Sequence, residues 1–386
     1  MPEVPRGGAA NGNGGRTEAL GSGGVRLEWD AGTRRLIEPG AGYGRMIRLE
    51  RHGGEVLCSY EKAGESWVRR SRDGGKTFGA PVRAMRYAQG AAANPETLEL
   101  KSGRLLLFVN ERPRGGAGPD ARFGIHLAAS DDGGRTWTPR AAGPLFQADS
   151  DPRNGCWEPA AIQTTSGEVL LFFANESPFR ASDEQEISLC RSTDEGATWT
   201  APCRVIFRAG RRDGMPVPLL LKNGQLAVAI EDNGLPNAPH FQPVVVTGGV
   251  REWVEGAPAA GNSARRRAAP GRAAVTAPPL GRDVYAGAPY LRQLPSGETL
   301  LSCQSTEGRP GGGDPLRRAR MAVYVGDRDA RNFTGRTFPF GDANPGAAGL
   351  WNALFVRDAS TVTALSGTTI GGVSGLWAVD ARVVRR

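Results

Sequence analysis

The sequence has few of the residues that metal sites and membrane spans require. It contains three histidines and five cysteines in 386 residues, and no Cys-x-x-Cys pair. We therefore expect no metal site and no cofactor. No run of about 18 apolar residues is present, so we expect no membrane-spanning helix. Cys190 and Cys203 flank one turn and are candidates for a disulfide, whereas reduced, buried thiols are expected for the other cysteines.

Lysine is also scarce, and the net charge of +8 comes almost entirely from arginine. A basic balance can serve binding to nucleic acid or to an anionic polysaccharide. The arginines are scattered, however, and no nucleic-acid recognition motif accompanies them. We therefore expect no nucleic-acid partner and interpret the charge as a compositional bias.

The first 24 residues are rich in Gly and Asn and have no apolar segment of the kind found in signal peptides. We predict a disordered tail over residues 1–24 and one domain over residues 25–386, present as a monomer. The localisation stays open.

Glycine and proline, by contrast, are abundant, with 55 and 28 copies, which indicates many tight turns. Three segments share the pattern Ser-x-Asp-x-Gly-x-Thr followed by Trp or Phe: 71–78, 130–137 and 192–199. In such a turn the Asp carboxylate can accept hydrogen bonds from backbone amides, Gly permits a positive φ, and the aromatic ring packs between layers of sheet.

A second repeat marks hairpins, with Gly after a small or polar residue between apolar runs. Its copies are centred on Gly53, Gly103, Gly167, Gly224 and Gly297, and a weaker sixth copy spans residues 354–365. Successive copies are spaced by about the length of one four-stranded propeller blade. Only residues 254–283 break this rhythm. We interpret them as a long loop or degenerate outer strands, with Arg265-Arg266-Arg267 as a solvated surface run.

The first repeat resembles the Asp boxes of sialidase-like β-propellers, which close the hairpin between the third and fourth strands of a blade. The resemblance implies an all-β fold, a six-bladed β-propeller of the sialidase type. It also implies that Asp73, Asp132 and Asp194 have structural roles.

In a propeller the inner strands converge on a central axis, and ligands bind at one mouth of that channel. The predicted second strands end at acids with notable regularity: Glu61, Glu111, Glu176, Glu231 and Glu307. An ionised side chain late in an apolar strand is costly to bury unless it is paired or functional. Paired carboxylates at the mouth suit glycoside cleavage, in which one acid protonates the leaving oxygen and the other carboxylate traps the sugar. Glu158 and Glu231 supply such a pair from adjacent blades.

The segments 157–159 (Trp-Glu-Pro) and 212–217, with Glu231 downstream, resemble the catalytic segments of glycoside hydrolase family 93, the exo-acting α-L-arabinanases. The resemblance covers about residues 40 to 235. It implies that Glu158 is the acid/base and Glu231 the nucleophile of a retaining enzyme, with an oligosaccharide or polysaccharide as substrate.

Further residues are expected near this pair. Trp157 offers a face for sugar stacking, and Arg212 joins the candidates for substrate binding. Asp213 is either a third catalytic carboxylate or a salt-bridge partner. Arg45 and Arg292 either hold the substrate or pair with the glutamates. Tyr290, also at the mouth, is more readily a packing or stacking residue than a nucleophile.

Two other functions fit the same fold. An exo-α-sialidase would use Arg45, Arg212 and Arg292 as an arginine triad and Tyr290 as nucleophile, although the aspartate acid expected on an early loop is not evident. A non-catalytic propeller that binds glycans or proteins would not require the paired carboxylates.

Overall fold

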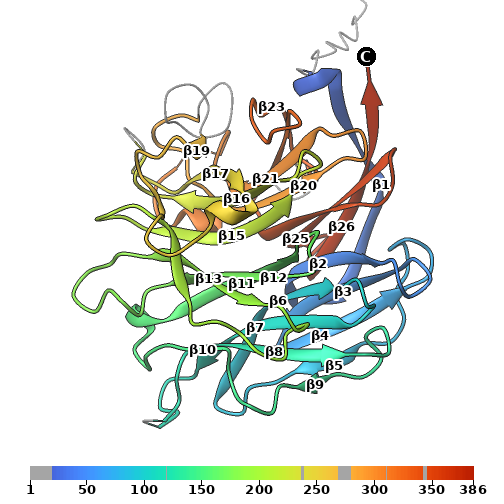
Figure 1. Cartoon of the computed structure of the whole chain (residues 1–386). Coiled ribbons are helices and arrows are strands. Elements are labelled where there is room, and N and C mark those ends of the chain that lie inside the picture. Colours follow the sequence, from blue (N-terminus) through green and yellow to red (C-terminus); the bar gives the residue numbers. More distant parts are fainter. Residues whose placement is uncertain (1–19, 119, 236–238, 268–279, 310, 342–345) are drawn as a thin grey trace, which may run out of the picture.

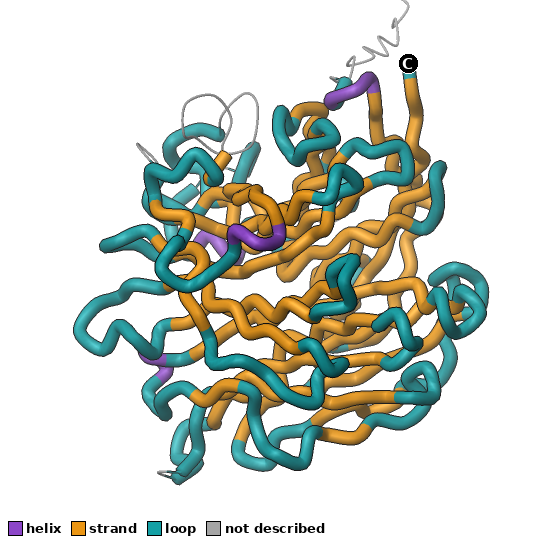
Figure 2. Tube along the Cα trace, viewed as in Figure 1, coloured by secondary structure: helices purple, strands orange, loops and turns teal. Residues whose placement is uncertain are grey.

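The computed structural model describes residues 20–118, 120–235, 239–267, 280–309, 311–341 and 346–386. Within these ranges 26 strands form six sheets, and the helices are four 3-10 turns of three residues each (Figures 1 and 2). None of the helices in the described ranges has the length and hydrophobicity needed to cross a bilayer. The prediction of an all-β, six-bladed propeller is confirmed.

The first three blades follow one another along the chain. Blade 1 contains β2 (Ala41–Leu49), β3 (Glu55–Lys62), β4 (Glu65–Ser71) and β5 (Val82–Met85). Blade 2 contains β6 (Gly90–Glu99), β7 (Leu105–Pro113), β8 (Gly124–Ser130), β9 (Thr138–Pro139) and β10 (Phe146–Gln147). Blade 3 contains β11 (Cys156–Gln163), β12 (Val169–Asn175), β13 (Glu186–Ser192), β14 (Cys203–Phe207) and β18 (Ala259–Ala260).

The other three blades complete the ring. Blade 4 contains β15 (Asp213–Leu220), β16 (Gln225–Asp232), β17 (Gln242–Gly249) and β19 (Arg266–Arg267). Blade 5 contains β20 (Ala286–Gln293), β21 (Thr299–Ser305), β22 (Arg320–Gly326) and β23 (Thr334–Thr337). Blade 6 contains β24 (Gly349–Val356), β25 (Thr361–Ile370), β26 (Val373–Arg385) and β1 (Val25–Pro39).

The two ends of the described chain meet in blade 6. The N-terminal strand β1 pairs antiparallel with the C-terminal strand β26, from Val25 opposite Arg385 to Pro39 opposite Gly375 (Figure 1). This pairing closes the ring, because the first strand of the chain belongs to the last blade. The 3-10 turn Ser22–Gly24 precedes β1, and the remainder of the predicted tail, residues 1–19, lies outside the described residues.

The hairpins fall where the sequence repeats place them, and they define the two faces of the ring. The first strand of each blade starts at one face, the mouth, and the first hairpin lies at the opposite face. The third strands then end at Ser71, Ser130 and Ser192, again on the face opposite the mouth. There the Asp73 carboxylate accepts hydrogen bonds from the amides of Lys76 (3.0 Å) and Thr77 (2.9 Å).

The segment after residue 254 supplies short outer strands to two blades. Strand β18 pairs parallel with β14 of blade 3, and β19 pairs with β17 of blade 4. Residues 268–279 of this segment lie outside the described residues. The interpretation of the arginine run as solvated is wrong for Arg266, which is 7 % exposed. It binds Asp213 and Asp232, because burying two carboxylates requires a buried cation beside them.

All five cysteines are free, and four of them are buried; Cys203 is half-buried. The proposed Cys190–Cys203 disulfide is therefore absent from the structure.

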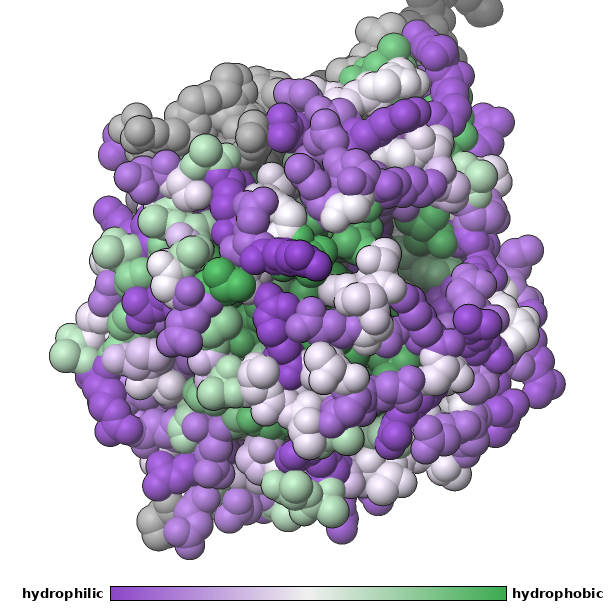
Figure 3. All heavy atoms as spheres, viewed as in Figure 1, coloured by the Kyte–Doolittle hydropathy of each residue, from purple (hydrophilic) through white to green (hydrophobic). Residues whose placement is uncertain are grey.

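Most of the face shown in Figure 3 carries hydrophilic side chains, with hydrophobic ones visible mainly in the hollows between them.

Candidate active site

Each of the six inner strands contains a β-bulge near the mouth, where its pairing with the second strand slips. At each bulge one non-glycine residue has a positive φ between 46° and 54°: Tyr43, Asn94, Glu158, Met215, Ala288 and Trp351. We call these six residues the bulge ring. Such backbone is strained for any side chain with a Cβ, and the bulge re-aims the side chain that it carries. Because all six blades repeat the bulge, it belongs to the fold, and Glu158 stands out as the ionisable carboxylate in the ring.

Three adjoining hollows meet at Glu158. The first has a volume of about 340 Å³ and lies toward blades 1 and 2, where Tyr43 and Asn94 line it. The second, of about 430 Å³, and the third, of about 390 Å³, are both lined by Glu231 as well as Glu158. The two candidate glutamates therefore share one concave space at the mouth, although they come from different blades.

The Glu231 carboxylate is held between blades 4 and 5. One of its oxygens accepts a hydrogen bond of 2.8 Å from the amide of Ala288. Two glycines make room for it: a Cβ at Gly287 would lie 2.6 Å from Oε2, and one at Gly214 would lie 3.1 Å from Oε1. The hydroxyl of Tyr285 is also close to this position: a Cβ at Gly287 would lie 2.4 Å from it. A Cβ at Gly287 would therefore clash with the carboxylate, and one at Gly214 would crowd it.

Burial in the protein raises the pKa of Glu158 to about 8. The Arg112 guanidinium opposes this shift, and the negative charges of Glu231 and Glu176 add to it. A carboxyl group with this pKa is protonated at neutral pH, which is the state that a general acid requires.

Burial also raises the pKa of Glu231, to about 7, while the hydrogen bond from Ala288 and the charge of Arg212 lower it. Its pKa thus lies below that of Glu158. The negative charge of Glu231 also favours the protonated form of Glu158, so Glu158 is the favoured site when the pair holds one proton. The pair can therefore supply one acid and one carboxylate.

Arg212 and Trp157 both line the second hollow. Arg212 forms an ion pair with Glu176, whose carboxylate also accepts a hydrogen bond of 2.9 Å from Gln185. The Trp157 ring packs on Phe123, with ring centroids 4.9 Å apart, and so stands in a fixed orientation at the side of the hollow. An aromatic face in that place suits a sugar ring.

Arg45, Tyr290 and Arg292 lie together elsewhere, in the hub of the propeller. Tyr290 of blade 5 meets Glu96 of blade 2 at 3.4 Å, a contact between opposite blades that only the central axis allows. Arg45 pairs with Glu96 at 3.2 Å and stacks over the rings of Tyr43 and Tyr290. Arg292 lies over the Tyr290 ring and 3.9 Å from Glu96. None of these three residues lines the hollows around Glu158.

Asp213 is a salt-bridge partner, which is one of the two roles that the sequence analysis considered for it. Its carboxylate is fully buried and binds Arg266, which also donates to Asp232 at 2.8 Å. Arg208 completes the cluster with a second bond to Asp232. This ion cluster ties the mouth ends of β15 and β16 to the outer strand β19, and Asp213 lines none of the three hollows.

Several residues of the site were not found from the sequence. Tyr285, Arg112 and Phe241 line the hollows but stand in segments that carry no motif. Asn94 and Trp351 had a usable signal, because they occupy the same place in their inner strands as Glu158 does. Among the described residues, no group of three His, Cys, Asp or Glu side chains is arranged to hold a metal ion.

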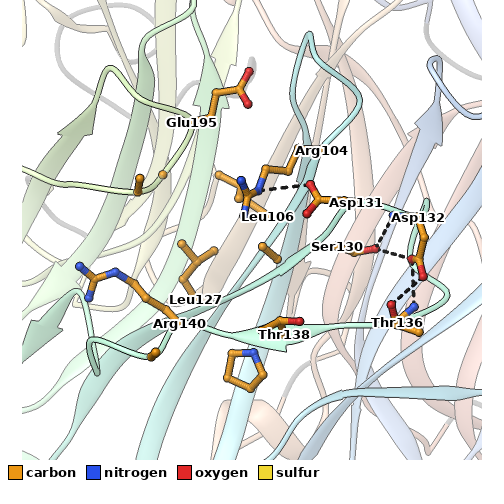
Figure 4. A pocket seen from close by; sticks show the side chains of 15 residues that line it. Arg104, Leu106, Leu127, Ser130, Asp131, Asp132, Thr136, Thr138, Arg140 and Glu195 are labelled. Atoms are coloured by element: carbon orange, nitrogen blue, oxygen red, sulfur yellow. Dashed lines mark hydrogen bonds and ion pairs between the residues drawn. The ribbon is translucent and has the colours of Figure 1, made fainter.

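A larger hollow, of about 520 Å³, lies at the opposite face, between the Ser-x-Asp turns of blades 2 and 3 (Figure 4). Its carboxylates are engaged in other contacts or held apart. Asp132 accepts hydrogen bonds from the Thr136 amide and hydroxyl, and desolvation cannot outweigh these bonds, so its pKa is lowered. Asp131 faces Arg104 at 3.6 Å, and Glu195 stands on the far wall. Both aspartates of this hollow are therefore engaged, Asp132 within its own turn and Asp131 with an arginine.

Comparisons with solved structures agree with this fold. The chain is similar to the family 93 α-L-arabinofuranosidase of Fusarium graminearum in complex with arabinobiose, with a TM-score of 0.66 and 18 % identity over 94 % of this chain and 97 % of that one. It is similar to the Penicillium chrysogenum α-L-arabinanase complexed with arabinobiose, with a TM-score of 0.63, 18 % identity and the same coverage. A Hadza microbial sialidase matches with a TM-score of 0.51 and 16 % identity, over 90 % of this chain and 66 % of that one.

No protein-family model matches the sequence, and no curated protein matches it. The identities to the solved structures are low, so these similarities concern the fold. The chain has the six-bladed β-propeller fold of the sialidase type, and it is structurally similar to a family 93 α-L-arabinofuranosidase and to an α-L-arabinanase.

Proposed function

We propose that the protein is a retaining glycoside hydrolase in which Glu158 is the acid/base and Glu231 the nucleophile. The observation that carries the proposal is the shared pocket: two carboxyl groups from neighbouring blades line the same hollows, and burial raises the pKa of both. The protonated Glu158 donates its proton to the glycosidic oxygen while the Glu231 carboxylate attacks the anomeric carbon. In the second step Glu158, now ionised, takes a proton from the water that releases the sugar.

The residues around Glu231 suit a nucleophile. The bond from the Ala288 amide orients one oxygen, and the glycines at 214 and 287 leave room for the carboxylate. Tyr285 stays protonated, since burial and the charge of Glu231 raise its pKa. Its hydroxyl is therefore available as a hydrogen-bonding group beside the attacking carboxylate.

An α-linked arabinan, or a similar neutral glycan, is the proposed substrate, with cleavage from a chain end. The support is of two kinds. Two solved structures of similar fold contain arabinobiose and are described as an arabinofuranosidase and an arabinanase. In addition, Arg212, the arginine beside Glu231, is paired with Glu176, so its charge is already compensated.

The sialidase alternative receives less support from the geometry. Its triad would bring Arg45, Arg212 and Arg292 to one carboxylate of the substrate. Arg45 and Arg292 share Glu96 at the hub, whereas Arg212 lines the hollow beside Glu231. Tyr290 lies with the hub residues and forms its contacts there.

Three substrates test the proposal: linear α-1,5-arabinan, 4-nitrophenyl α-L-arabinofuranoside and sialyllactose. We expect hydrolysis of arabinan with retention of anomeric configuration. NMR of the first products measures that configuration. Glu158→Gln and Glu231→Gln should each abolish arabinan hydrolysis, and Glu50→Gln, at an exposed position, should leave it unchanged. Full activity in either pocket variant, or inversion of configuration, would contradict the roles assigned here. Binding of arabinan without any turnover by the wild type would favour the non-catalytic alternative.

A further inference from the structure

The first hollow is set apart from the other two by what faces it. Glu158 lines all three hollows, but Glu231 lines only the second and third. In a glycosidase the nucleophile contacts the sugar whose bond is broken, and the acid contacts the oxygen that joins this sugar to the leaving group. If the proposed roles hold, space that meets the acid and not the nucleophile receives the leaving group.

A second carboxylate stands in this first hollow, that of Glu61. It lies late in β3 and is the residue of blade 1 that corresponds to Glu231 of blade 4. Glu231 pairs with the residue just before the bulge residue of its inner strand, and Glu61 pairs with Gly42, just before Tyr43. Each carboxylate also accepts a bond from the bulge-ring amide of the next blade, in this case Asn94 at 3.4 Å.

The surroundings of Glu61 suit a ligand rich in hydroxyl groups. Its long bond to the Asn94 amide leaves most of the acceptor capacity of the carboxylate open, and no salt bridge engages it within the described residues. Lys62, the nearest cation in sequence, pairs instead with Glu38. Trp157 and Trp351 line the same hollow, so that aromatic faces accompany the polar groups. Carboxylates with aromatic neighbours bind sugar hydroxyls by charge-assisted bonds and stacking.

We infer that this hollow binds the leaving-group sugar of the substrate and that the Glu61 carboxylate accepts a hydrogen bond from one of its hydroxyls. The inference rests on the proposed function. It assigns a substrate whose leaving group is itself a sugar unit, as in an oligosaccharide or polysaccharide, and it makes Glu61 a residue that recognises that unit.

Glu61→Gln is a clean probe because the fold already tolerates Gln at the corresponding position. In blade 5 that position is Gln304, which accepts a 2.9 Å bond from the Trp351 amide in the same way. The substitution therefore keeps the bond to Asn94 and removes the negative charge. Glu111→Gln is the matched control: Glu111 also lies late in the second strand of its blade, but it lines none of the three hollows.

The experiment compares kcat/KM on linear arabinotriose with kcat/KM on 4-nitrophenyl α-L-arabinofuranoside and 4-nitrophenyl α-arabinobioside. For Glu61→Gln we expect a loss of about ten- to a hundredfold on arabinotriose, the cost of one hydrogen bond to a charged group. The nitrophenyl substrates, whose leaving group has no sugar hydroxyl, should keep their values within about twofold. Glu111→Gln should match the wild type on all three.

Equal losses on all three substrates, or no loss on any, would overturn the inference. Neither result concerns the proposed function, which is tested by wild-type turnover and by the Glu158 and Glu231 variants. If the wild type hydrolyses none of the three, the proposed function fails. The affinity for arabinotriose, measured by calorimetry, then tests whether the first hollow binds a sugar. An affinity that Glu61→Gln leaves unchanged would then also refute the role of Glu61.

Discussion

Replacing Glu158 by Gln should stabilise the protein at neutral and alkaline pH while it removes activity. The folded state raises the pKa of this carboxyl group from 4.5 to about 8, chiefly because the group is buried. Between these two pH values the folded chain holds a proton that the unfolded chain has lost. The free energy of unfolding therefore falls as pH rises through this window. Gln resembles the protonated acid and has no such loss.

The size of the effect follows from the pKa. At pH 7 the difference of about 2.5 pH units above the ordinary value corresponds to about 3.4 kcal/mol. The side chain lines a pocket and keeps contact with water, which weakens the desolvation of its ionised form, so we take about 2 kcal/mol as the expected gain. At pH 5, only half a pH unit above the ordinary pKa of 4.5, the same reasoning leaves a gain of about 0.5 kcal/mol.

Urea unfolding of the wild type and of Glu158→Gln at pH 5, 7 and 8 measures this directly. Glu111→Gln gives an independent comparison, because burial raises the pKa of Glu111 to about 7 as well, outside the pocket. It should show a gain with the same direction, smaller at pH 8 because its pKa is lower, and retain full activity. Equal unfolding free energies for wild type and Glu158→Gln at pH 8 would refute the reasoning, since the carboxylate would then be ionised in the folded protein at no cost.

Three further outcomes follow from the contacts around the site. The wild-type kcat/KM should rise with pH through about 7, as Glu231 loses its proton, and fall above about 8, as Glu158 ionises; a flat profile between pH 6 and 9 would contradict both roles. Arg266→Met should lower the free energy of unfolding by about 3–5 kcal/mol, because two buried carboxylates lose their common partner; a loss below about 1 kcal/mol in urea titrations would show that the cluster is not needed. Gly287→Ala should reduce kcat/KM at least about tenfold, since its Cβ would press on the Glu231 carboxylate, whereas Gly115→Ala, with open space around it, should behave as wild type.

The fold could be predicted because its signals are local. Each Ser-x-Asp turn is closed by its own carboxylate, and each first hairpin by its own glycine, so a repeat read along the chain maps directly onto one blade. The short outer strands after residue 254 could not be predicted in this way. They are two residues long, and β18 joins the preceding blade. What fixes Arg266 is contact with Asp213, 53 positions away, and no spacing rule records such a distance.

The candidate site was predicted in part for the same reason. Glu158 and Glu231 carry short motifs, and both reach the mouth. Arg45 and Arg292 also lie on inner strands, but they come after the bulge, and their side chains meet Glu96 in the hub. The bulge could not be predicted from the sequence, because the six bulge-ring residues share no side-chain type. Only the slipped register distinguishes a residue that faces the pocket from one that lies under it.

The register also separates the five glutamates that look alike in the sequence. Counted from the bulge of each inner strand, the positions that correspond to Glu231 are Glu61, Asn110, Ala174, Gln304 and Gly367. Glu111 is one residue farther along its strand, and since side chains alternate between the faces of a sheet, it points away from the side that Glu231 occupies. Of the five regularly spaced glutamates, only Glu61 and Glu231 therefore occupy corresponding positions in the fold.

This comparison shows which feature of Glu231 supports its assignment. The hydrogen bond from the next blade cannot do so, because Glu61 and Gln304 accept the same bond in their own blades. What sets Glu231 apart is the space around it: it shares two hollows with Glu158, and glycines stand on both sides of its carboxylate. The clamp recurs in blades 1, 4 and 5, and in blade 4 it holds a carboxylate that shares two hollows with Glu158, whereas Glu61 of blade 1 shares one.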